Sequence, residues 1–375
     1  MTKPLFVLTE RDLAKLSVMM LLSVILFGLS GLVIMIFLQW ITRQSYAQDS
    51  IDKHGISRVS ASRLGGAAIF ISWLGLLLAG YRSDYFGDAS GGPSGPYWID
   101  WIAVGCCGLL GLVEDLRNNY LSPRCRLYAE FGIFGLAVWV WPVLIPVDLG
   151  IPGLDLLMGL PLIGWLLTVV FCVGFVNSVN MADGANGLMA GVMTIAFSLF
   201  YVSTGEFVYA AMMTACAVFT IFNVISGRLF LGDAGAYGLG ASLAISGLYL
   251  FYENVFSAAF LACLFSYPCI DFIMTLARRY RAGRSIFLPD NDHLHNRLHY
   301  HFQRWLPSKT LANSLTGGLV VASSSGLTTV GYIYQWWPVT SDLWAWLFLF
   351  QCIGYWIVFY LTGLGRRNFQ YELRL

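Results

Sequence analysis

Long apolar runs alternate with short polar segments along almost the whole chain. A helix needs about 20 mostly apolar residues to cross a bilayer. Runs of roughly this length cover about 14–41, 64–81, 98–113, 128–146, 158–176, 185–203, 207–226, 235–252, 256–276, 312–334 and 343–363. The joints near 204–206 and 252–255 are tight, so the count has a range of ten to twelve. The pattern therefore predicts an all-α integral membrane protein, a polytopic bundle of about eleven transmembrane helices.

The composition agrees with this pattern. Of the 375 residues, 57% are hydrophobic and 11% are charged, whereas about a quarter of a soluble domain is charged. The first run exceeds the roughly 7 to 15 apolar residues of a secretory signal, so we expect it to be an uncleaved helix. The sequence contains no internal repeat or linker, and residues 1–375 are expected to form a single polytopic membrane domain.

The distribution of basic residues predicts the orientation. An odd number of helices places the two termini on opposite sides of the membrane. With the N-terminus outside and the C-terminus in the cytoplasm, the only lysines and arginines facing outward are Lys3, Arg11, Lys15 and Arg82, as the positive-inside rule requires. The expected cytoplasmic active-site loops are then about 42–63, 114–127, 177–184, 227–234 and 277–311.

Four polar clusters fall on this predicted cytoplasmic face. They are "VEDL" (Glu114, Asp115), "NSVNMADGANG" (Asn177, Asn180, Asp183, Asn186), "FLGDAG" (Asp233) and "DHLHNRLHYH", which contains four of the five histidines. The three-residue steps of the second cluster keep its members near one face if the helix persists that far. Asp233 lies just before a predicted helix, where carboxylates and backbone amides suit a metal and phosphate site.

Carboxylates and amides indicate a hard cation, Mg²⁺ with Mn²⁺ as a second candidate, held together with substrate phosphates. The implied substrate is a phosphate ester. Structural interpretations also exist: Asp233 as a helix cap, and Asp271 as a partner of Arg278 or Arg279 rather than a catalytic group. The histidines could form a zinc site, but cysteine or carboxylate ligands at the usual spacing do not accompany them. The convergence of four clusters on one face favours an active site.

These residues resemble a known family, the polyprenyl-phosphate N-acetylhexosamine-1-phosphate transferases of glycosyltransferase family 4, which include the WecA and MraY enzymes. The resemblance covers roughly positions 52 to 300. "SRLGGAAIF" (62–70) is similar to P-R-x-G-G, and "GLVEDL" followed by "RL" (111–127) is similar to G-x-x-D-D…K-L. "NSVNMADGANGL" is similar to N-x-x-N-x-x-D-G-x-N-G-L, and "FLGDAG" matches outright. "RRYRAGRSIFLPDNDHLHNRL" (278–298) is similar to R-R…G-R-S-x-F…P-D…H-x-H-H-R-L.

The family implies ten or eleven helices in the bacterial inner membrane, with the active site open to the cytoplasm. Its reaction joins a UDP-sugar to a polyprenyl phosphate such as undecaprenyl phosphate, and gives a polyprenyl diphosphate-sugar and UMP with Mg²⁺. This step initiates cell-wall or lipopolysaccharide biosynthesis. The roles implied by position are metal ligands Asn180 and Asp233, catalytic acids Glu114, Asp115 and Asp183, and substrate-binding residues Asn186, His293, His295 and Arg297. A homodimer is compatible with the resemblance, and no nucleic acid partner is expected.

The chain departs from the family pattern at several positions. Glu114 replaces the first aspartate of a pair, Ser62 replaces a proline, and Asn296 replaces the last histidine. Arg126 and Arg228 replace lysines, which keeps the charge but changes a point donor into a fork. Asn296 lies in the loop expected to contact the sugar, so the motifs do not identify which sugar is transferred.

In the expected reaction the lipid phosphate attacks the β-phosphorus of the nucleotide sugar. A phosphate monoester has a second pKa of about 6, so most of the nucleophile is already a dianion at pH 7. We therefore expect Asp115 to act mainly by positioning or by organising the metal site, rather than as a general base.

Two other classes fit part of the pattern. An intramembrane prenyltransferase needs two Asp-rich motifs, whereas the acids here come singly outside the 114/115 pair. A transporter would place polar residues near helix midpoints, whereas these polar residues gather at one set of helix ends.

Overall fold

A computed structural model describes residues 10–44, 61–82, 97–117, 120–283, 285 and 291–364. Most of the loop predicted at 42–63, with Lys53 and Arg58, lies outside the described residues, as do 118–119, 284, 286–290 and the C-terminal arginines. The described chain is almost entirely helical, and its pairing between extended segments is confined to one parallel bridge, Ser62 with Leu229. The all-α prediction is confirmed for the described residues.

Each predicted apolar run coincides with one helix or with consecutive helices. In the first half these are α1 (Glu10–Ile41), α2 (Gly65–Arg82), α3 (Tyr97–Arg117), α4 (Pro123–Val140), η1 (Pro142–Leu144), α6 (Pro161–Ala182), α7 (Leu188–Thr204) and α8 (Phe207–Ser226). In the second half they are α9 (Gly232–Tyr252), α10 (Ala258–Leu264), α11 (Ser266–Arg281), α13 (Lys309–Val321), η2 (Ala322–Gly326), α14 (Leu327–Ile333) and α15 (Trp344–Leu364). Two short helices lie outside the runs: α5 (Pro152–Met158) precedes the run predicted at 158–176, and α12 (Leu294–Phe302) lies in the loop predicted at 277–311.

Five of the described helices, namely α1, α6, α8, α9 and α15, are long and apolar enough to cross a membrane by length and composition. A sixth span results if α10 and α11, which are bent by 80° at their junction, are counted together. These helices support a multi-pass membrane protein. The count of eleven spans and the orientation of the termini stay predictions.

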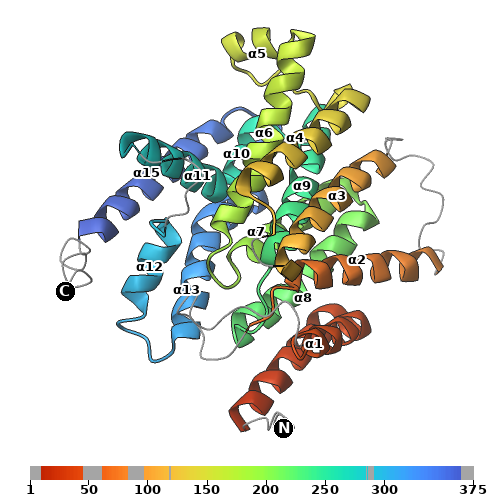
Figure 1. Ribbon diagram of the computed structural model, residues 1–375, viewed down its shortest axis with the longest axis vertical. Coiled ribbons are helices and arrows are strands. Elements are labelled where there is room, and N and C mark those ends of the chain that lie inside the picture. The colour runs from red at the N-terminus through yellow and green to blue at the C-terminus, as the bar shows by residue number, and fades with distance from the viewer. Residues whose placement is uncertain are drawn as a thin grey trace.

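Helix α9 forms the centre of the bundle. In its most apolar stretch 94% of the residues are buried, compared with 17% in α15, and Figure 1 shows α9 in the interior while α1 lies at the edge. Small residues permit this central position, because a side chain on Gly66 of α2 would overlap the backbone of Gly235 on α9. Close backbone approach is a usual basis of helix packing in membranes, where lipid is as apolar as leucine.

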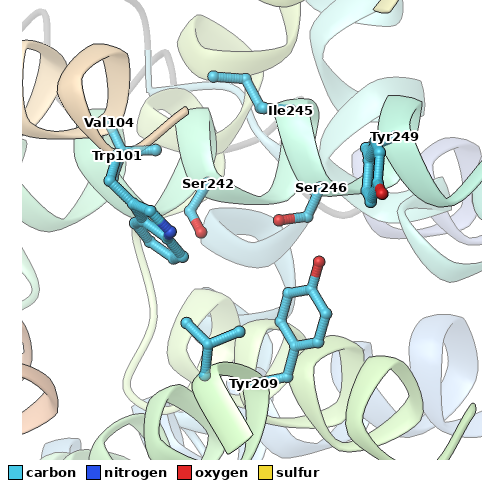
Figure 2. Close-up of a pocket in the computed structure, with 8 residues that line it drawn as sticks. Trp101, Val104, Tyr209, Ser242, Ile245, Ser246 and Tyr249 are labelled. Carbon is cyan, nitrogen blue, oxygen red and sulfur yellow. The ribbon is translucent and has the colours of Figure 1, made fainter. Parts of the chain in front are cut away.

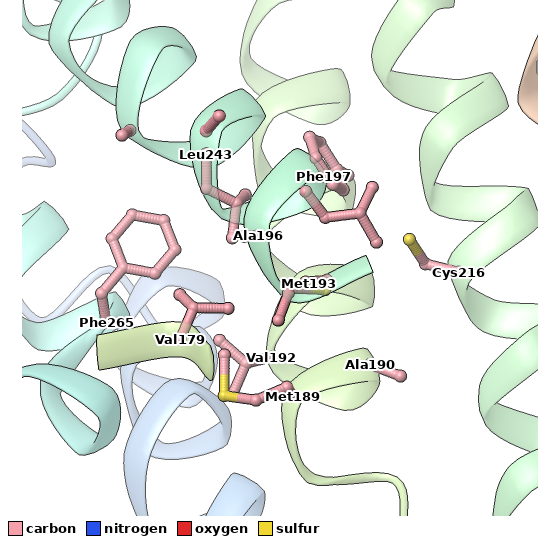
Figure 3. Packing of buried hydrophobic residues seen from close by; sticks show 14 of the residues in the cluster. Val179, Met189, Ala190, Val192, Met193, Ala196, Phe197, Cys216, Leu243 and Phe265 are labelled. Atoms are coloured by element: carbon pink, nitrogen blue, oxygen red, sulfur yellow. The ribbon is translucent and has the colours of Figure 1, made fainter. Parts of the chain in front are cut away.

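The interior beside α9 is filled by interdigitating apolar side chains. Figure 3 shows Met193 and Ala196 of α7 close to Leu243 of α9, with Val179 of α6 and Phe265 nearby, and all five are buried. Such dense packing holds helix axes in fixed positions. The C-terminal end of α6 and the N-terminal end of α9, which carry the polar motifs, are therefore attached to a rigid base.

Candidate active site

The N-terminus of α9 is fixed by a carboxylate from α3. Asp115 is 1% exposed, and its two oxygens accept hydrogen bonds from the backbone N–H groups of Asp233 (3.0 Å) and Ala234 (2.8 Å). These groups have no partner within the helix, and a capping oxygen satisfies them. Gly232 makes the close approach possible: its φ is +73°, and a Cβ there would meet the Asp115 carboxylate. Asp115 thus holds Asp233 in place, and its catalytic role stays a prediction.

Two motifs that are far apart in the sequence pair directly beside this cap. Ser62 donates its N–H to the carbonyl of Arg228 (3.0 Å) and accepts from the N–H of Phe230 (2.8 Å). The next turn continues the contact, because Gly66 N–H donates to the carbonyl of Leu231 (2.7 Å). The "SRLGG" segment therefore supports the chain that leads into Asp233.

The side chain of Asp233 meets residues from two other helices. Asn180 of α6 donates to one of its oxygens at 2.8 Å, and Arg126 Nη1 of α4 lies 3.3 Å from the other. The carboxylate remains 27% exposed. The structure thus brings together the two predicted metal ligands, and it adds Arg126, which the sequence motifs marked only as a replacement for lysine.

Asp183 lies directly after α6 and completes the acidic part of the site. Its side chain is half-buried and makes no hydrogen bond to any described residue. Burial, together with the negative charges of Asp233 and Asp115, raises the pKa of Asp183 to about 7. A bound cation would relieve this repulsion between carboxylates.

The oxygen donors around Asp233 suit a hard cation such as Mg²⁺. Within the described part of the chain, no three His, Cys, Asp or Glu side chains gather as metal ligands, so the histidines there do not form a zinc cage. Mg²⁺ commonly uses one or two carboxylates, waters and substrate phosphates. Asp233 with the neighbouring Asn180 and Asp183 fits such a shared site, and the identity of the metal stays a proposal.

The expectation that four residues of "NSVNMADGANG" share a helix face is wrong for Asn186. Helix α6 ends at Ala182, and the chain turns through Gly187 at a φ of +74°, so the regular helical spacing stops. Asn186 is buried and donates to Ser314 Oγ of α13 at 3.4 Å. The adjacent Gly187 N–H donates to Asn223 Oδ1 at 2.5 Å. Nucleotide binding by Asn186 stays a prediction.

Glu114 has a local partner. The carboxylate is buried and accepts a hydrogen bond from the Leu121 N–H at 3.1 Å. It therefore connects the end of α3 to Leu121, just before α4, and its catalytic role stays a prediction.

Asp271 anchors the histidine-rich segment. One of its oxygens lies 2.5 Å from His293 Nδ1, and the other accepts from the Tyr355 hydroxyl (2.7 Å) and the Leu294 N–H (3.2 Å). Asp271 is almost completely buried. The sequence offered an arginine partner or a catalytic role for it, whereas the structure places it under the start of α12, where it fixes the direction of His293.

His295 contacts the "NSVNMADGANG" segment. The Tyr267 hydroxyl accepts from the His295 N–H (3.2 Å) and lies 2.7 Å from His295 Nδ1. Because this hydroxyl already accepts one hydrogen bond, we assign it as the donor to Nδ1, which leaves the ring proton on Nε2. A Cβ on Gly184 would overlap Nε2, so the ring lies directly against the residue that follows Asp183.

His295 gives a testable pH dependence. Burial lowers its pKa to about 4, with partial compensation from the Asp271 charge. In the unfolded chain it would titrate near 6.5, so stability is expected to fall by a few kcal/mol as pH decreases from about 6.5 to 4. Melting temperatures of the purified protein at pH 7 and pH 5 check this. The decrease should be smaller in His295→Asn, and an equal decrease in both proteins would contradict the assignment.

Arg297 already has several partners. It makes a bidentate pair with Asp292 (2.7 and 2.9 Å), donates to the carbonyl of Phe359 (2.5 Å) and stacks on that ring at 3.6 Å. It therefore connects α12 to α15. Its expected contact with the sugar diphosphate stays a prediction, and Arg126 is the cation that the structure places at Asp233.

Glu130 is a further buried polar residue that was not among the residues predicted from the sequence. This residue of α4 is fully buried and accepts a hydrogen bond from Asn177 of α6 at 2.5 Å. Its position inside the apolar run predicted at 128–146 could have identified it, because a carboxylate within a membrane span is rare and usually has a defined partner.

A small cavity lies farther along α9, between α3 and α8. It has a volume of about 20 Å³, enough for one water molecule, and Figure 2 shows the hydroxyls of Ser242, Ser246 and Tyr209 directed into it. The Ser242 hydroxyl has no hydrogen-bond partner among the described residues. The cavity is far too small for a nucleotide sugar, so it is separate from the site at Asp233.

Comparison with known proteins gives a consistent result. Residues 97–251 match the family described as glycosyl transferase family 4. The chain is 31% identical, over 249 residues, to the phospho-N-acetylmuramoyl-pentapeptide-transferase of Lactiplantibacillus plantarum, covering 62% of this chain and 75% of that protein.

A second relative carries a different sugar in its name. The chain is 26% identical, over 295 residues, to the "Probable undecaprenyl-phosphate N-acetylglucosaminyl 1-phosphate transferase" of Bacillus subtilis, covering 74% of this chain and 78% of the relative. The two names share transfer of a phosphorylated sugar and differ in which sugar is carried.

Proposed function

The chain belongs to glycosyl transferase family 4 and is a phosphotransferase, and we propose that it transfers a sugar 1-phosphate from a UDP-sugar to undecaprenyl phosphate with release of UMP. The sugar is of the N-acetylhexosamine type. The observation that carries the proposal is the meeting of Asp233, Asn180 and Arg126 at the capped start of α9. The name of the Bacillus subtilis relative includes undecaprenyl phosphate, which supports the lipid acceptor, and the relatives do not favour a prenyltransferase or a transporter.

The proposed reaction is a displacement at phosphorus. An oxygen of the lipid phosphate attacks the β-phosphorus, a new P–O bond forms, and the bond to the bridging oxygen breaks so that UMP leaves with the electron pair. Both reactants are anions, so positioning and neutralisation of charge dominate the barrier. Arg126, already at the site, supplies a cationic fork suited to phosphate oxygens.

Asp233 and Asn180 would hold the proposed Mg²⁺, with Asp183 nearby. The ion supplies charge neutralisation on the diphosphate when bound. The residues of the chain then have separate tasks: Asp115 fixes the position of Asp233, and His295 packs against Gly184 to fix the segment that carries Asp183.

We also propose which side of the membrane the active site faces. The basic residues favour the cytoplasmic side. We place the protein in the bacterial inner membrane, at the first step in the synthesis of a cell-surface glycan. A homodimer is compatible with this arrangement.

A panel of radiolabelled UDP-sugars tests the proposal. Purified protein is incubated with undecaprenyl phosphate, Mg²⁺ and each UDP-sugar in turn, and both UMP and labelled lipid are measured. We expect equal amounts of the two products with at least one UDP-N-acetylhexosamine, and none when the metal is removed with a chelator. Failure to form labelled lipid from every UDP-sugar would overturn the proposal.

A further inference from the structure

Glu130 is a buried carboxylate for which the reaction described above has no task. It is 0% exposed, and one oxygen accepts from Asn177 Nδ2 at 2.5 Å. Its other oxygen, Oε1, has no hydrogen-bond partner among the described residues. A carboxylate inside a helix bundle is costly unless a nearby charge compensates it. Glu130 therefore keeps its charge only if a cation lies near it.

Arg126 provides that cation. It lies four residues before Glu130 on α4, so the two side chains are on the same helix face, and its charge acts on Glu130. The same guanidinium lies 3.3 Å from Asp233. Arg126 thus contacts Asp233 at the site, and its charge also acts at longer range on Glu130 within the bundle.

The facing helix repeats this arrangement with amides. Asn177 and Asn180 are three residues apart on α6; the first donates to Glu130 and the second to Asp233 at 2.8 Å. Helices α4 and α6 therefore meet through two polar levels. The inner level is Glu130 with Asn177, and the outer level joins Arg126 and Asn180 at Asp233.

We propose that Glu130 is a positioning residue: by sharing Arg126 with Asp233 it leaves the Asp233 carboxylate available to a divalent cation. If Arg126 interacted with Asp233 and with no other carboxylate, its guanidinium would compete with a divalent cation for the Asp233 oxygens. The part that Glu130 plays in transfer rests on the proposed function, whereas its effect on cation binding is measurable without any substrate.

The test is Mn²⁺ binding to the full-length protein in detergent, measured by electron paramagnetic resonance without substrate. Glu130→Gln keeps an acceptor for Asn177 and removes the charge, and we expect it to weaken binding about fivefold, the scale of a partly exposed ion pair. Arg126→Gln removes the competitor and should strengthen binding by a similar factor. The double variant should behave as Arg126→Gln does, because Glu130 acts through Arg126. Glu206→Gln, at the start of α8, is the control for loss of a carboxylate.

Several outcomes overturn the inference. If Glu130→Gln binds Mn²⁺ as tightly as the wild type, Glu130 has no effect on cation binding. If Glu130→Gln weakens Mn²⁺ binding equally in the wild type and in Arg126→Gln, Glu130 acts on the cation directly and not through Arg126. Absence of Mn²⁺ binding by the unaltered protein also overturns it. If Glu130→Gln does not fold, Arg126→Gln alone decides, since unchanged binding excludes competition. A failed UDP-sugar panel would reject the proposed function while leaving these binding results valid.

Discussion

Asp233→Asn is expected to lower kcat for sugar-phosphate transfer by about 1000-fold or more. The change keeps the size of the side chain but removes the negative charge that meets Asn180 and Arg126. Loss of one group that stabilises developing charge commonly costs about 100- to 1000-fold, and the proposed metal site would lose its principal carboxylate as well. Labelled lipid formed per minute, at saturating substrates and normalised to folded protein, measures the effect.

Asp155→Asn is the matched control for this prediction. Asp155 of α5 accepts a hydrogen bond from the Leu149 N–H at 2.7 Å and has no contact with the residues around Asp233. The same chemical change there should leave kcat within about twofold of the wild type, as is usual for a substitution outside the site. Activity of Asp233→Asn within tenfold of the wild type would remove Asp233 from the centre of the proposed mechanism.

The helices were predictable because their signal is long and redundant. A run of some twenty apolar residues predicts a helix even when its assigned ends shift by a few residues. The long apolar helices lie where these runs predict them. The irregular parts were not predictable in this way. The bend between α10 and α11 and the π-helical turn at η2 occur inside continuous apolar runs, where hydropathy carries no information about backbone direction.

The site was predictable as a set of residues and only partly as a geometry. The family resemblance assigned Asn180 and Asp233 to one metal site, and the structure brings them to 2.8 Å. The sequence gave no indication that Arg297 would pair with Asp292, because the partners of a loop residue depend on tertiary packing. Glu130 was overlooked because a single acid in an apolar run has no local motif, and its partner Asn177 lies on another helix.

Asp115→Asn is expected to lower kcat by about 100-fold at pH 8.5, and the variant is not expected to recover as the pH rises from 6.5. The wild-type carboxylate accepts from two backbone N–H groups, those of Asp233 and Ala234. An amide presents only one oxygen, so its NH₂ group faces one of these donors and leaves it unsatisfied, at a cost of about 1 to 3 kcal/mol. Asp233 then moves with the start of α9, and small displacements at a reacting centre are costly.

The pH series separates this positioning role from general-base catalysis. The second pKa of the lipid phosphate is about 6, so roughly nine in ten molecules are dianions at pH 7 and a base can contribute little there. If Asp115 removed a proton, raising the pH would replace it and the variant would recover. Burial raises the pKa of Asp115 to about 7, and the cap needs the ionised carboxylate, so a ratio of wild-type to variant activity that rises or stays constant with pH supports positioning. Recovery of tenfold or more by pH 8.5 would establish a base role and contradict it.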